Sequence, residues 1–158
     1  MPATQIKDIL KTVRHFHEHV RDLFNNAAED LKETGKEDRH LLGRTEALLR
    51  YLARHEEHFA EVVEEYERQG KTAVLDTWMQ FADQGDEVSA VLESHALEPG
   101  LSIEEIVRRA LEFDGAMVAL YRQLATETSA QSVQEFFADL IKLEESKSHQ
   151  YSLAALDG

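Results

Sequence analysis

Four long stretches of the chain repeat hydrophobic residues at alternating steps of three and four positions. This spacing puts the hydrophobic side chains on one face of an α-helix, as in helices that pack along a bundle. Gly35 and Gly70 are expected to end the first two helices, and the segment from Ser102 to Glu105 is a capping box that opens the third. The pattern predicts helices over residues of about 5–34, 38–69, 102–126 and 130–156.

A segment of about residues 71–100 connects the second and third predicted helices. It is too long for a tight turn, so these two helices need not be antiparallel neighbours. Its hydrophobic spacing predicts one or two short helices with a break near Gly85. Four long helices joined through one long crossover describe an all-α four-helix bundle, and we expect residues 1–158 to form a single domain.

The composition narrows the class of protein. Two prolines and seven glycines in 158 residues favour long helices over sheets, and the absence of cysteine excludes disulfides, iron–sulfur clusters and thiol nucleophiles. A net charge of −14 argues against binding to nucleic acid or to an anionic membrane. No segment approaches 18 consecutive apolar residues. We therefore expect a cytoplasmic protein, and by default a homodimer.

Polar residues interrupt each hydrophobic stripe near its middle. A buried carboxylate without a partner costs several kcal/mol, so such residues must be paired, hydrated or bound to an ion. On the second helix we place His55 on the stripe and His58 at its flank, with Glu56 and Glu57 facing water. The interrupting residues are His17 on the first helix, His55 and His58 on the second, Asp114 on the third, and Glu144 and Lys147 on the fourth.

The spacing of these residues repeats between the two halves of the chain. His17 and Asp114 each lie seven positions before a stripe aromatic, while His55-x-x-His58 matches Glu144-x-x-Lys147. Together with the helix order, the crossover and the segment ALEFDGAMVALY, this resembles the ferritin-like superfamily and, within it, the rubrerythrin-like members. Those proteins surround two irons with one Glu from each of two helices and a Glu-x-x-His pair from each of the other two.

The chain departs from this pattern at most positions. Compared with the motif that the resemblance implies, His17 and His55 each stand in place of a Glu, Asp114 is a shortened Glu, and Lys147 stands in place of a His. Only His58 and Glu144 keep the residue type of the family.

Two functions follow as alternatives, and the sequence does not decide whether the protein is an enzyme. In the first, three imidazoles and a carboxylate hold one iron or zinc ion per chain, with oxygen or peroxide chemistry implied by the resemblance. In the second, Lys147 pairs with the carboxylates in a metal-free network, and the bundle is a structural or interaction module. A third arrangement retains two metals with help from flanking carboxylates. The metal ligands of the first are His17, His55, His58 and Asp114 or Glu144, and the flanking carboxylates of the third are Glu18, Glu112 and Glu145.

Overall fold

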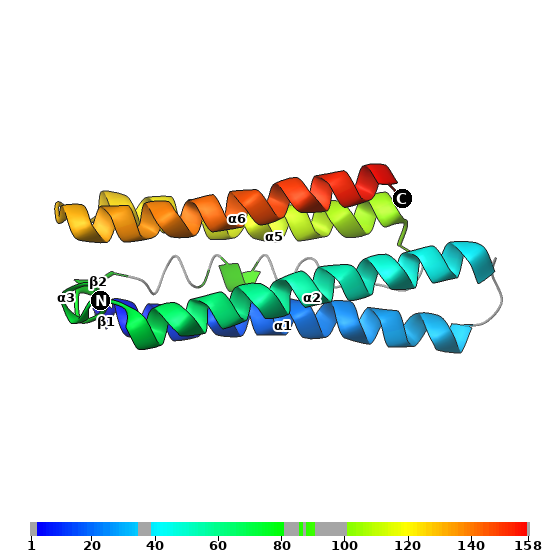
Figure 1. Ribbon diagram of the computed structural model, residues 1–158, viewed down its shortest axis with the longest axis horizontal. Coiled ribbons are helices and arrows are strands. Elements are labelled where there is room, and N and C mark those ends of the chain that lie inside the picture. The colour runs from blue at the N-terminus through cyan, green and yellow to red at the C-terminus, as the bar shows by residue number, and fades with distance from the viewer. Residues whose placement is uncertain (1–2, 35–38, 81–85, 87, 91–100, 158) are drawn as a thin grey trace.

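The protein is a bundle of four long helices. The computed structural model describes residues 3–34, 39–80, 86, 88–90 and 101–157. Figure 1 shows α1 lying alongside α2 and α5 lying alongside α6, so that two helical hairpins face each other. This confirms the predicted all-α four-helix bundle. The helices are α1 (Ile6–Thr34), α2 (Arg39–Gln69), α5 (Ile103–Thr126) and α6 (Gln131–Asp157).

Local chemistry explains two of the helix ends. Ser102 is the N-cap of α5, where its hydroxyl oxygen accepts a hydrogen bond from the backbone N–H of Glu105 at 3.2 Å. After α2, the N–H of Gly70 donates to the carbonyl of Tyr66 at 3.0 Å. A Cβ atom at position 70 would lie 2.7 Å from that carbonyl oxygen, so a larger residue would force a shift. The predicted end at Gly35 lies outside the described residues.

The crossover begins at the end of the bundle where α1 starts. After the short helix α3 (Thr72–Leu75), strand β2 (Trp78–Met79) pairs antiparallel with β1 (Thr4–Gln5), as Figure 1 shows. The backbone N–H of Ile6 extends this pairing by donating to the carbonyl of Thr77 at 2.9 Å. Strands of two residues are too short to show an alternating pattern, so the sequence did not predict them. The break expected near Gly85 and residues 91–100 of the crossover lie outside the described residues.

The hydrophobic core runs along the inside of the four helices. On α1, α5 and α6 the predicted stripes are buried almost throughout, from Leu10 to Phe24, Val107 to Leu124 and Val133 to Tyr151. On α2 the buried face lies one position away from the predicted one in its middle, because Glu56 and Val63 are fully buried there. In the described part of the chain, no helix is long and apolar enough to cross a membrane.

Candidate functional site

A cluster of five charged or titratable side chains lies in the middle of the core. Every long helix contributes to it, and the residues are at most 5% exposed. The structure therefore brings together four of the residues that interrupt the predicted stripes, and adds one that the sequence analysis had placed in water. The members are His17 from α1, Glu56 from α2, Asp114 from α5, and Glu144 and Lys147 from α6.

The ammonium group of Lys147 lies at the centre of this cluster. Its Nζ atom is 2.9 Å from Oε1 of Glu56, 2.9 Å from Oδ1 of Asp114 and 3.2 Å from Oε2 of Glu144. Glu56 also accepts through its second oxygen, at 3.1 Å. Three carboxylates from three helices thus converge on one lysine.

His17 bridges two of the same carboxylates. Its Nδ1 atom is 2.6 Å from Oε2 of Glu56, and its Nε2 atom is 2.8 Å from Oε1 of Glu144. A ring whose two nitrogens both face carboxylates is best satisfied as a doubly protonated imidazolium, which has two N–H donors. Burial and the Lys147 charge lower the pKa of His17, but Glu144 and Glu56 outweigh them and leave the pKa above its ordinary value. The two carboxylates thus favour the imidazolium form of His17, while its Nδ1 atom also lies 3.3 Å from the Nζ atom of Lys147.

Hydroxyl groups donate further hydrogen bonds to each of the three carboxylates. Tyr121 donates to Glu144 at 3.2 Å, Tyr151 donates to Glu56 at 2.8 Å, and Ser148 donates to Oδ2 of Asp114 at 3.0 Å. Burial and the nearby carboxylates raise the pKa of both tyrosines well above the ordinary value, so the phenols are neutral donors.

Some contacts at the centre are ionic rather than directional. His17 Nε2, Asp114 Oδ1 and Glu144 Oε2 have no well-aligned hydrogen bond, although each lies within 3.2 Å of an oppositely charged partner. Coulombic attraction between these buried charges therefore stabilises the three contacts, even though their hydrogen-bond geometry is poor.

Aromatic rings enclose the two cations. The ring of Phe59 stacks on His17 with centroids 4.1 Å apart, and Phe113 meets the same imidazole edge-on at 5.2 Å. Lys147 Nζ lies 4.7 Å from the Phe59 centroid and 5.4 Å from the Phe113 centroid, which is cation–π range. These rings exclude water while adding favourable contacts to both positive charges.

The pKa values of Glu56 and Asp114 shift in opposite directions. Burial acts to raise the pKa of Glu56, but Lys147 and His17 together lower it to about 2. Burial is also the largest influence on Asp114, where it prevails over Lys147 and raises the pKa to about 7. Burial acts to lower the pKa of Lys147, but the carboxylates reverse this and hold the pKa far above its ordinary value, so the lysine is a fixed cation.

The charges of the cluster almost cancel. With all groups ionised, two cations face three carboxylates for a net charge of −1, and one proton on Asp114 makes the cluster neutral. Near neutral pH the cluster can exchange that proton at Asp114. Glu56 stays ionised and Lys147 stays protonated across this range. The arrangement therefore balances buried positive and negative charges.

On α2 the structure corrects the predicted site residues. His58 is exposed, so the prediction that it borders the core is wrong, and Glu56 is fully buried rather than facing water. His55 is half-buried and packs between the rings of Tyr51 and Tyr151, with centroids at 4.4 and 5.8 Å. Burial lowers the pKa of His55 and so favours the neutral imidazole.

A signal for Glu56 was present in the sequence. Glu56 lies four positions after Leu52, three before Phe59 and seven before Val63, and all three of these residues are buried. From Leu52, helical spacing places the next buried position either three residues later, at His55, or four residues later, at Glu56. The preference of carboxylates for water favoured the wrong choice, because the lysine partner on α6 is 91 positions away in the sequence.

The flanking carboxylates of the third arrangement lie outside the cluster. Glu18 is partly exposed and pairs with Arg14 at 3.5 Å, and Glu145 is exposed with Arg122 at 3.7 Å. Glu112 is also exposed. The structure therefore does not bring these three side chains to the centre of the bundle.

The cluster does not fit the metal centre that the resemblance implied. The glutamates of the two pairs are Glu56 and Glu144, and the residues three positions after them are Phe59 and Lys147 rather than histidines. Lys147 Nζ already lies where the carboxylates converge, and a second cation there would be repelled. Among the described residues, no group of three His, Asp or Glu side chains is arranged to hold an ion.

Comparisons with known proteins support the fold alone. No family model matches the chain, and no curated protein matches its sequence. A solved structure of a proposed ferritin-like diiron-carboxylate protein from Thermotoga maritima is similar over 98% of this chain and 97% of that chain, with a TM-score of 0.57 and 15% identity. The chain thus has the fold of a ferritin-like four-helix bundle.

Proposed function

We propose that this protein is a ferritin-like bundle in which a lysine–carboxylate–histidine network replaces the metal centre, and that it acts as a structural or interaction module. One observation carries the proposal: the ammonium of Lys147 lies within 3.2 Å of carboxylates from α2, α5 and α6. A positive charge at that point compensates the acids as a metal ion would. It offers neither an open coordination position nor a change of oxidation state.

The environment of the lysine supports the same conclusion. Phe59 occupies the position three residues after Glu56, where the resemblance implied a histidine, and its ring faces both buried cations. Both nitrogens of His17 face carboxylates, and Nδ1 also lies 3.3 Å from Lys147 Nζ, so both ring nitrogens are engaged within the cluster. A function that needs a bound metal would require all three residues to rearrange.

The predicted single-ion site of three imidazoles and a carboxylate does not keep its ligand set, because His58 is exposed and His55 is half-buried. A revised single-ion alternative would use the three carboxylates and His17, which converge on Lys147. It requires Lys147 to leave the centre so that an iron or zinc ion takes the place of its ammonium. Oxygen or peroxide chemistry would then be a further step. Metal binding distinguishes the two proposals directly.

The test is elemental analysis of protein purified without an affinity tag, after incubation with Fe(II), Zn(II) or Cu(II) and removal of free ions. We expect well under one ion per chain and an unchanged melting temperature. Metal held at the surface by His58 should be lost in the His58→Ala variant, because His58 is exposed. One ion per chain that persists in His58→Ala and disappears in Glu56→Gln would overturn the proposal.

We further propose that the protein is a cytoplasmic homodimer that binds no nucleic acid. The acidic net charge of −14 supports the last point. Light scattering coupled to size-exclusion chromatography tests the dimer, with a mass near 36 kDa expected against 18.0 kDa for one chain.

A further inference from the structure

A cavity of about 570 Å³ lies where α2, the start of α5 and the end of α6 meet. Its walls are mainly apolar, and Leu153 is one of the few large hydrophobic residues with substantial exposure, at 48%. Small-molecule sites in proteins are concave, largely apolar and of about this volume, with a few polar groups that orient the ligand. The apolar wall is formed by Leu48, Ile103, Leu153 and Ala154.

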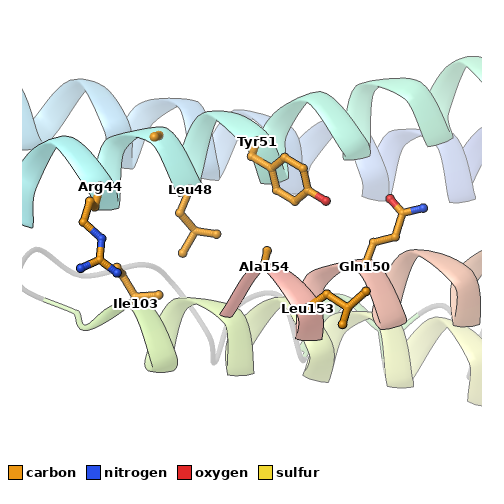
Figure 2. Close-up of a pocket in the computed structure, with 8 residues that line it drawn as sticks. Arg44, Leu48, Tyr51, Ile103, Gln150, Leu153 and Ala154 are labelled. Carbon is orange, nitrogen blue, oxygen red and sulfur yellow. The ribbon is translucent and has the colours of Figure 1, made fainter. Parts of the chain in front are cut away.

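The polar groups of the cavity have a distinct arrangement. Figure 2 shows Arg44 at one end, with the Tyr51 hydroxyl and the Gln150 amide toward the other. Arg44 has no hydrogen-bond or ion-pair partner among the residues that the structure describes. None of the eight lining residues is acidic, although the chain as a whole has 31 Asp and Glu against 17 Lys and Arg.

This absence of carboxylates distinguishes the cavity from two other hollows in the described part of the molecule. A groove between α2 and α6 has three acids, Glu65, Glu135 and Asp139, and one cation, Lys71, on its lining. A groove between α5 and α6 has Glu145. An anion would be repelled at the first and would compete with Glu145 for Arg122 at the second. Of these three hollows, the one at Arg44 is the one whose described lining has a cation and no carboxylate.

We propose that this cavity binds a small amphipathic carboxylate, with its apolar body against Leu48 and Leu153 and its carboxylate on the guanidinium of Arg44. The planar guanidinium matches a carboxylate in a two-point contact, which makes arginine suited to this role. The proposal does not depend on the buried cluster, because none of the cluster residues lines the cavity.

The aromatic residues next to the cavity provide a reporter for binding. Tyr51 lines the cavity and its ring lies 4.4 Å from that of His55, which lies 5.8 Å from that of Tyr151. A ligand that contacts Tyr51 therefore changes the environment of the His55 ring protons. Exposed His58 is close in sequence but outside the cavity, and its resonances serve as the internal control.

The experiment titrates the full-length protein with decanoate at 150 mM salt, followed by calorimetry and by the histidine ring resonances. We expect saturable binding of one decanoate per chain, with shifts at His55 and none at His58. Decanol, which has the same chain without the charge, should bind more weakly to the wild type. Arg44→Gln should weaken decanoate binding at least tenfold and leave decanol unchanged, since the charge-assisted hydrogen bonds to the carboxylate are lost.

Arg54→Gln is the matched control, because Arg54 is also an exposed arginine of α2 but does not line the cavity. The proposal is overturned if decanoate does not saturate, or if Arg44→Gln and Arg54→Gln bind it equally. Equal loss of decanoate and decanol in Arg44→Gln would also overturn it, because the arginine would then shape the cavity rather than hold the anion. Equal melting temperatures of the two variants exclude misfolding as the cause.

Discussion

Replacing Lys147 by methionine should reveal how much the buried cation contributes to stability. Methionine keeps an unbranched apolar side chain of similar length, so packing against Phe59 and Phe113 is largely retained. The variant leaves three carboxylates, from Glu56, Asp114 and Glu144, with His17 as their one cationic partner in the cluster. Two of the three acids then lack a counter-charge.

The size of the effect follows from protonation of those two acids. Asp114 has a pKa of about 7 in the wild type, so taking up one proton there costs little. Keeping a second carboxyl group protonated in the folded state at pH 7, when the same group in the unfolded chain has a pKa near 4, costs roughly 4 kcal/mol, since each pH unit contributes about 1.4 kcal/mol. This value lies within the range of about 3–5 kcal/mol that is typical when a buried ion pair loses one partner.

Urea unfolding followed by circular dichroism measures this loss. We expect Lys147→Met to lose about 4 kcal/mol at pH 7 and roughly 1–2 kcal/mol at pH 5, where the second protonation is nearly free. Lys142→Met is the control, because Lys142 is an exposed lysine of the same helix and should change stability by less than about 0.5 kcal/mol. A loss at Lys147 as small as at Lys142, or one that is the same at both pH values, would refute the reasoning.

Three further predictions concern the same cluster. The pKa of Glu56 is about 2 in the folded protein and 4.5 ordinarily, so its contribution to the free energy of unfolding is present above pH 4.5 and is lost as pH falls toward 2. Glu56→Gln should therefore make the free energy of unfolding, taken from unfolding curves, depend less on pH between about pH 2.5 and 5. The pKa of Asp114 is raised from 3.8 to about 7, so this group makes stability fall as pH rises through that window. Asp114→Asn should remove the fall, so its stability relative to wild type should increase from pH 5 to pH 8; a constant difference in urea midpoints would contradict this. Phe59→His combined with Lys147→His places imidazoles three residues after both glutamates and should create Co(II) binding with visible absorbance, whereas either single variant should bind none in the core.

Much of the fold was predictable because it depends on periodicity. The positions of His17, Asp114, Glu144 and Lys147 on buried stripes follow from steps of three and four along α1, α5 and α6. Each of those helices has hydrophobic residues on both sides of the polar position, which fix the buried face without reference to any partner.

On α2, periodicity alone does not determine which polar residue is buried. The stripe of this helix admits either His55 or Glu56, and local sequence favours exposure of the carboxylate. What buries Glu56 is the combined attraction of Lys147 and His17, together with the Tyr151 hydroxyl, all of them distant in sequence. Since the energy of a buried charge is determined by partners on other helices, a pattern read along one helix cannot decide it.

The pairing of charges across the two hairpins has a consequence for alignment. To the buried cluster, the α1–α2 hairpin contributes His17 and Glu56, and the α5–α6 hairpin contributes Lys147 with the carboxylates of Asp114 and Glu144. Lys147 pairs with Glu56 and His17 pairs with Glu144, so both of these ion pairs join one hairpin to the other. A slide of one hairpin along the other by one helical turn, about 5.4 Å, would break both at once. A purely hydrophobic interface could reform its contacts after such a slide. Here the slide would separate buried charges from their partners on the other hairpin, so the cluster favours one register of the two hairpins.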